Sequence, residues 1–156
     1  MTSFQLQGLD PALFQSLFDL DDLALRRLGI RRRVVDEHPG VPCRVSLQDA
    51  ALGEEVLLLP FEHHPVDSPY RASGPIFVRR NATRPDLAPG EVPDYVQRRL
   101  ISLRAYDAEH MMIAAEVLPG VETAAQLHRL FDDSKVDYVH LHNAHPGCYS
   151  CLARRR

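Results

Sequence analysis

Hydrophobic positions either alternate with polar ones or form short continuous runs over the middle of the chain, which predicts a protein built mainly from β-strands. Five such segments cover residues 43–47, 55–61, 75–79, 100–106 and 111–118. The last two are separated by the turn-forming stretch Asp107-Ala108-Glu109-His110, so we expect them to pair as a β-hairpin. A sixth strand is expected over residues 136–141.

Helical spacing of hydrophobic residues is limited to the N-terminal part and to one later segment. Asp10-Pro11 opens a stretch with helical periodicity, and a second piece, which Asp21 or Asp19 can cap, ends at Gly29. Residues 122–131 carry the later helical stripe. The pattern predicts a single α+β domain over residues 1–156, with a largely antiparallel β-sheet, an N-terminal helical segment and one later helix.

Composition narrows the classes of protein to which the chain can belong. With 156 residues, 45% hydrophobic and 25% charged, it has the composition of an ordinary globular domain. A formal net charge of -3 argues against nucleic-acid binding, which needs a basic face. The longest apolar run, residues 56–61, is too short to span a bilayer. Three cysteines without a secretion signal indicate a reducing compartment, so we expect a cytoplasmic protein.

Chemically reactive side chains are concentrated near the C-terminal end, in residues 140–151. This stretch contains three of the eight histidines and two of the three cysteines. Because side chains alternate along a strand, His140 and His142 are expected on one face, with Cα atoms about 7 Å apart. Pro146-Gly147 must form a turn, and Cys148 is expected to begin a helical turn after it.

Four roles for this stretch remain open. His140, His142, Cys148 and Cys151 match zinc in ligand number and type, although the interval between the two pairs is short. Alternatively, Cys148 is a nucleophile at a helix N-terminus, with His142 or His140 as the base and Asn143 orienting the histidine. A dithiol redox pair of Cys148 and Cys151 is disfavoured, because a thioredoxin-like site lies near the start of a βαβ unit. The fourth role is purely structural.

Candidate substrate-binding residues lie elsewhere in the chain. Arg104, in the strand over residues 100–106, can hold an anionic group through its planar guanidinium, and Tyr70 and Arg71 follow in a proline-flanked loop. Glu62-His63-His64 ends a buried strand, where a polar cluster at a pocket mouth is expected. The sequence thus favours a small enzyme with a Cys/His site acting on a small anionic substrate. The alternative is a noncatalytic module that is stabilised by zinc or binds a small molecule. The oligomeric state is not specified.

A family resemblance rests on short blocks that follow one another along the chain. The blocks are Pro42-Cys43-Arg44, Asp49-Ala50 with Gly53-Glu54, Pro69-Tyr70, Gly74-Pro75-Ile76-Phe77-Val78, Tyr106-Asp107, and His142-Asn143-Ala144 with Gly147-Cys148. In this order they resemble the bacterial domain of unknown function family 1203. The resemblance covers nearly the whole chain and implies a single bacterial domain, but no reaction, cofactor or catalytic residue.

Overall fold

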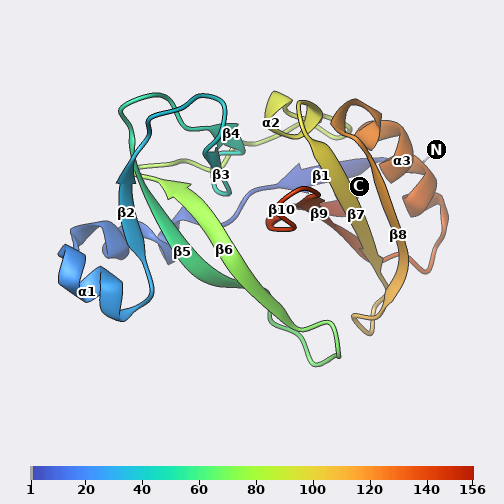
Figure 1. The fold of residues 1–156 in the computed structure, drawn as a ribbon. Coiled ribbons are helices and arrows are strands. Elements are labelled where there is room, and N and C mark those ends of the chain that lie inside the picture. Colours follow the sequence, from blue (N-terminus) through green and yellow to red (C-terminus); the bar gives the residue numbers. More distant parts are fainter. Residues whose placement is uncertain (1) are drawn as a thin grey trace.

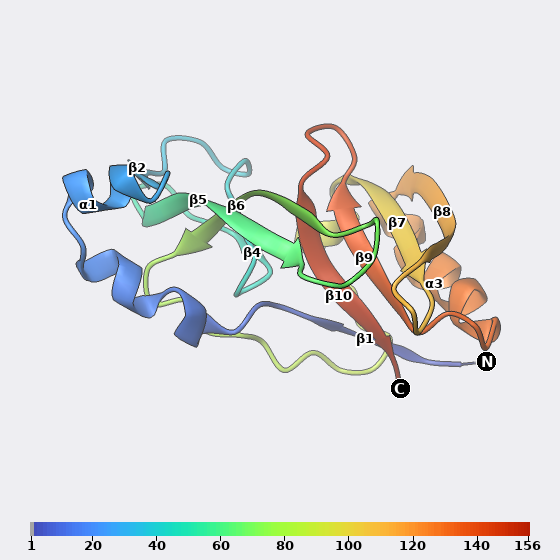
Figure 2. The same cartoon turned by 90° about the horizontal axis from the view of Figure 1, so that it is seen from below.

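The computed structural model describes residues 2–156 and contains two five-stranded sheets that lie side by side (Figures 1 and 2). The first, sheet A, has the strand order β1-β10-β9-β7-β8, and the second, sheet B, has the order β2-β5-β6-β3-β4. Every strand pair is antiparallel except β3 with β6. The expected α+β class with largely antiparallel strand pairing is therefore confirmed, although the strands form two sheets where one was expected.

Sheet A is covered on one face by helix α3 (Thr123–Asp132). Alternate residues of its strands, such as Leu103, Val139 and Leu141, are fully buried against Leu127 and Phe131 of this helix. The strands of the sheet are β1 (Phe4–Gln7), β7 (Leu100–Tyr106), β8 (Met112–Pro119), β9 (Tyr138–Asn143) and β10 (Tyr149–Arg155). A short helix, α2 (Asp94–Gln97), precedes β7, and the 3-10 turn η3 (Gly120–Glu122) precedes α3. The opposite face of the sheet carries the polar residues of the same strands.

Sheet B is covered by the N-terminal helical segment, which consists of η1 (Pro11–Leu13), η2 (Gln15–Asp19) and α1 (Asp22–Arg27). Phe14, Phe18 and Leu25 from this segment form a core with buried residues of the sheet. The strands are β2 (Arg31–Val34), β3 (Pro42–Cys43), β4 (Gln48–Asp49), β5 (Glu55–His64) and β6 (Ala72–Arg79). The end of the β5–β6 hairpin reaches over the face of sheet A that is opposite to α3 (Figure 2).

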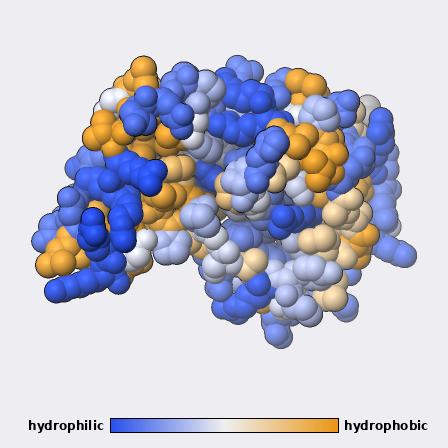
Figure 3. Space-filling model, in the orientation of Figure 1, coloured by the Kyte–Doolittle hydropathy of each residue, from blue (hydrophilic) through white to orange (hydrophobic). Residues whose placement is uncertain are grey.

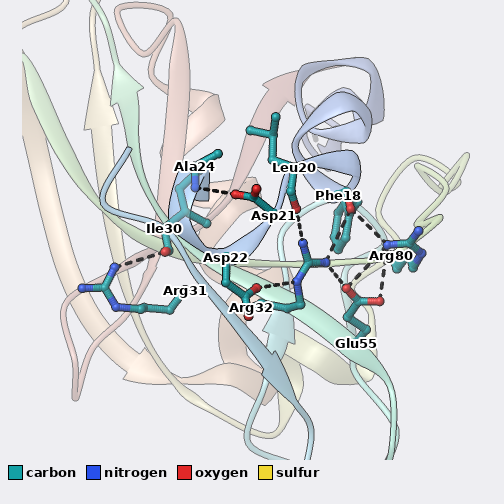
Figure 4. Close-up of polar contacts among 10 residues, drawn as sticks. All are labelled: Phe18, Leu20, Asp21, Asp22, Ala24, Ile30, Arg31, Arg32, Glu55 and Arg80. Carbon is teal, nitrogen blue, oxygen red and sulfur yellow. Dashed lines mark hydrogen bonds and ion pairs between the residues drawn. The ribbon is translucent and has the colours of Figure 1, made fainter. Parts of the chain in front are cut away.

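One arginine joins the N-terminal segment to sheet B (Figure 4). Arg32 of β2 donates hydrogen bonds to the carbonyl oxygen of Leu20 at 2.6 Å and to the carboxylate of Asp22 at 3.1 Å, and it also pairs with Glu55 of β5. Asp21 accepts a hydrogen bond from the Ala24 amide, which confirms the expected helix cap. Arg32 is therefore engaged within the protein, and its charge is not free for an external phosphate.

Several boundaries differ from the sequence-based expectation. Residues 44–47 form a turn between the short strands β3 and β4, and Cys148 is followed by strand β10 rather than a helix. The N-terminal segment is two 3-10 pieces and one short α-helix. The β7–β8 hairpin, β5, β6, β9 and α3 agree with the expectation within a few residues. Among residues 2–156, no helix has the length and apolar character that crossing a bilayer requires.

Candidate functional site

A cleft of about 600 Å³ lies between the two sheets and contains the side chain of Cys148. Much of its wall is apolar, and hydrophobic side chains are exposed over β5 and β6 on the face seen in Figure 3. The lining comes from β3, β5, β6, the start of β7 and the β9–β10 turn: Gly40, Pro42, Arg44, Leu58, Pro75, Phe77, Arg98, Arg99, Leu100, Asn143, His145, Pro146 and Cys148. Such a lining suits a small ligand with an apolar part.

The β9–β10 turn positions Cys148 at this cleft. The backbone N–H of Asn143 donates a hydrogen bond to the backbone carbonyl oxygen of Cys148 at 2.9 Å, and the backbone N–H of Gly147 donates to the backbone carbonyl oxygen of Asn143 at 2.8 Å. Gly147 has a φ of 80°, a left-handed conformation that glycine adopts without steric cost. The turn leaves the Cys148 side chain only partly exposed.

The Cys148 sulfur contacts a buried arginine. Arg44 is 1% exposed, and its guanidinium donates hydrogen bonds to the Cys148 Sγ at 2.9 Å and to the Tyr149 carbonyl oxygen at 2.7 Å. Within residues 2–156, no carboxylate forms an ion pair with Arg44. An arginine side chain remains charged inside a protein, and a buried charge is costly unless an opposite charge accompanies it. The guanidinium donates to the carbonyl oxygens of Pro42 and Tyr149 and to the Cys148 sulfur, and none of these partners is a carboxylate.

Asn143 provides a second polar group beside the sulfur. Its side-chain Nδ2 lies 3.9 Å from the Cys148 Sγ, and the residue is 4% exposed. The side-chain Oδ1 is buried and has no hydrogen-bond partner among the described residues. Because a buried oxygen without a partner is costly, this atom is well placed to accept a hydrogen bond from a bound ligand.

A second concentration of reactive side chains lies on the face of sheet A opposite to α3, under the end of the β5–β6 hairpin. We call it the histidine–tyrosine cluster. Its rings are packed at centroid distances such as 4.8 Å between His64 and His140 and 5.1 Å between His63 and His142. The cluster comprises His63, His64, Tyr70, Arg104, Tyr106, Tyr138, His140, His142 and Tyr149.

A chain of hydrogen bonds links the Tyr70 carbonyl group, His64, Tyr138 and His110 in this cluster. The Nδ1 of His64 lies 2.8 Å from the Tyr70 carbonyl oxygen, to which it can only donate, so the Nε2 of a neutral His64 ring is a hydrogen-bond acceptor. The Tyr138 hydroxyl therefore donates to that Nε2 at 2.6 Å. The Tyr138 oxygen is left to accept a hydrogen bond from the Nδ1 of His110 at 2.8 Å.

Three histidines of the cluster are neutral at neutral pH. Burial lowers the pKa of His140 to about 2. Repulsion from the neighbouring histidines, when these are protonated, and from Arg104 adds to this effect. Burial likewise lowers the pKa of His63 and of His142 to about 4. Each of the three has one buried ring nitrogen without a hydrogen-bond partner among the described residues. These atoms are Nδ1 of His63, Nδ1 of His140 and Nε2 of His142.

Comparison with known proteins identifies the family to which the chain belongs. The family model "Protein of unknown function (DUF1203)" matches residues 40–155 of the 156-residue chain. The chain belongs to the DUF1203 family. No curated protein and no solved structure matched the chain. The matched range of the DUF1203 protein includes both the Cys148 cleft and the histidine–tyrosine cluster.

The structure of this DUF1203 protein divides the residues that the sequence grouped into one site. Cys148 and Asn143 lie together at the cleft. His140, His142, Arg104 and Tyr70 belong to the histidine–tyrosine cluster. The Nδ1 of His142 donates to the Gly147 carbonyl oxygen at 3.0 Å, so this nitrogen is occupied and is not free to take a proton from Cys148. Arg71 is exposed and forms an ion pair with Glu62 at 3.0 Å.

The four residues expected to bind zinc do not converge in the DUF1203 protein. Cys151 is fully buried in the hydrophobic core of sheet A, on the face opposite to His140 and His142. Within residues 2–156, no group of three or more histidine, cysteine or acidic side chains is arranged to hold a metal ion. The geometric reason is the alternation of side chains along β9 and β10.

The residue that sequence reasoning missed is Arg44. The sequence predicted a strand over residues 43–47 and assigned no role to Arg44, whereas the chain turns there and buries the whole segment. The available signal was an arginine set among hydrophobic residues between Val41 and Leu47, since an arginine that cannot reach water needs a partner.

Proposed function

We propose that this protein is a small enzyme in which Cys148 is a thiolate nucleophile and Arg44 is the residue that stabilises it. The observation that carries the proposal is the 2.9 Å contact between the Cys148 sulfur and a buried guanidinium that has no carboxylate partner within residues 2–156. Thiolates, not thiols, are the nucleophilic form of cysteine, and an adjacent arginine favours them. This chemistry does not require His142 as a base.

The cleft defines the kind of substrate that suits the thiolate. Leu58, Phe77 and Leu100 provide apolar walls, and the Asn143 side chain can hydrogen-bond a polar group next to the reacting atom. In the proposed step, the sulfur donates an electron pair to an electrophilic carbon of the substrate. A carbon–sulfur bond forms, and the leaving group departs with its bonding electrons. The reaction class is therefore thiol-dependent group transfer on a small substrate with an apolar part.

Alkylation by iodoacetamide tests the role of Arg44 in the reactivity of Cys148. Cys43 and Cys151 are fully buried and serve as internal references. We expect Arg44→Met to slow the alkylation of Cys148 by about tenfold or more, because the guanidinium that stabilises the thiolate is lost. Arg44→Lys should retain part of the rate. Arg33→Met removes an exposed arginine on β2 and should leave the rate unchanged.

The ultraviolet absorbance of the thiolate supplies a readout that does not depend on access to the cleft. The absorbance at neutral pH should be present in the wild type and lost in both Cys148→Ser and Arg44→Met. Circular dichroism establishes that the Arg44 variants are folded. A folded Arg44→Met protein with wild-type absorbance and wild-type alkylation rate would contradict the proposal.

The same cleft supports a second function, which is the binding of a small molecule without a reaction. Its apolar walls and the unpaired Asn143 oxygen are the features that favour it. The two functions differ in their dependence on sulfur. A ligand that is only bound should bind Cys148→Ser as well as the wild type, whereas a substrate should leave a covalent mass increase on Cys148 of the wild type alone.

A further inference from the structure

Arg104 lies at the centre of the face of sheet A that is opposite to α3, without an acidic partner. Its cross-strand neighbours are His140 on β9 and Ala115 on β8. Ser102 and Tyr106 flank it on the same face of β7, and Leu152 lies beyond His140 on β10. None of these residues is acidic, and within residues 2–156 no ion pair or side-chain hydrogen bond involves Arg104.

The side chains next to Arg104 add further unsatisfied polar atoms. His140 is 5% exposed, and its buried Nδ1 has no partner among the described residues, as is also true of the Nδ1 of His63. The two rings lie 6.1 Å apart. In a neutral imidazole either nitrogen can carry the proton, so each of these two atoms can act as a hydrogen-bond donor.

The charge of this face distinguishes between possible ligands. A cation would be repelled by the guanidinium of Arg104 and would find no carboxylate at the positions directly opposite it on β8 and β9, in agreement with the absence of a metal-ligating group in the described part of the chain. An anion would satisfy the charge of Arg104 and would accept hydrogen bonds from the unpartnered imidazoles. The guanidinium geometry matches the planar or tetrahedral arrangement of oxygen atoms in carboxylates and phosphates.

We propose that the histidine–tyrosine cluster is a binding site for a small oxyanion, a carboxylate or phosphate group, held by Arg104 with His63 and His140. Arg104 and the two histidines do not line the Cys148 cleft. The site is therefore separate from the proposed thiolate, and it stands independently of the proposed enzyme activity. Arg104 is partly exposed beside the small residue Ala115, which leaves it accessible from the β8 side.

Calorimetric titration with inorganic phosphate, sulfate and acetate tests this site on the full chain. We expect at least one of the three anions to bind to the wild type, and the order of affinities separates a phosphate site from a carboxylate site. Arg104→Gln should weaken this binding by roughly tenfold or more, as expected for the loss of a charge-assisted pair. Arg129→Gln is the matched control, because Arg129 is exposed on α3, on the other side of sheet A, and its loss should not change the affinity.

Two further measurements test whether the anion binds at the proposed residues. The ring signals of His63 and His140 in NMR spectra should shift on titration of the wild type and not of Arg104→Gln. Cys148→Ser should bind the anion as the wild type does, so that failure of the thiolate proposal and failure of this one are distinguishable. The inference would be overturned if none of the three anions bound, or if Arg104→Gln and Arg129→Gln bound with equal affinity.

Discussion

Stability should fall steeply when the pH drops below about 6.5, the ordinary pKa of histidine. His140 and His142 are buried and neutral in the folded protein, with pKa values lowered to about 2 and about 4, whereas both accept a proton once the chain unfolds. The unfolded state then binds more protons than the folded state, so the free energy of unfolding decreases as the pH falls from 6.5 toward the folded-state values. Above pH 6.5 this contribution is fully present.

The expected slope is about 1.4 kcal/mol per pH unit for each fully buried histidine, or about 3 kcal/mol per unit for the two together. His63 is half-buried and adds less. Urea denaturation at a series of pH values measures the slope. His140→Phe keeps a ring of similar shape without a titrating group, so it should reduce the slope by about half. Parallel pH profiles for this variant and the wild type would show that His140 does not contribute.

Asp49→Ala should destabilise the protein by about 3 kcal/mol, because it leaves two arginines without their shared partner. The Asp49 side chain is 2% exposed, and its carboxylate accepts hydrogen bonds from Arg98 at 3.2 Å and from the Nη1 of Arg99 at 3.0 Å. Asp49 belongs to β4 of sheet B, whereas the two arginines connect α2 to β7 of sheet A. The ion pair thus joins the two sheets. The loss is at the low end for a buried pair, since both arginines retain contact with water.

Glu62→Ala is the matched control for this prediction. It breaks the ion pair with Arg71, in which both side chains are well exposed, and should cost less than about 1 kcal/mol. Urea denaturation of the wild type, Asp49→Ala and Glu62→Ala measures the free energy of unfolding of each protein and tests this prediction. Equal losses in the two variants would mean that the Asp49 pair does not hold the sheets together.

The fold was predicted best where the alternation of hydrophobic residues and the turn-forming residues between two strands indicate the same structure. The β7–β8 hairpin was predicted because apolar residues such as Ile101 and Leu103 alternate with polar ones on both sides of a short turn. Strands β2 and β10 were missed because their arginines mask this alternation. Strand β2 is an edge strand, and edge strands carry charges without loss of packing.

The candidate site was only partly predictable, because its contacts join segments far apart in the chain. Strand alternation correctly placed His140 and His142 on one face of β9, but it could not indicate that the β5–β6 hairpin brings His63 and His64 onto the same face. The contact of Arg44 with Cys148 spans 104 residues. The alternation of hydrophobic and polar residues indicates on which face of its own strand a side chain lies. It carries no information on which distant segment packs against that face.

The pairing of β1 with β10 has a consequence for the order in which the protein folds. Phe4 lies opposite Arg155, and Leu6 lies opposite Ala153, so within residues 2–156 the first strand pairs with the last one. All strands of sheet B lie within residues 31–79, so this sheet can form while the ribosome is still adding sheet A. During translation, Phe4 and Leu6 therefore lack their partner strand until β10 emerges, and the closure of the loop between β1 and β10 is expected to be a late step.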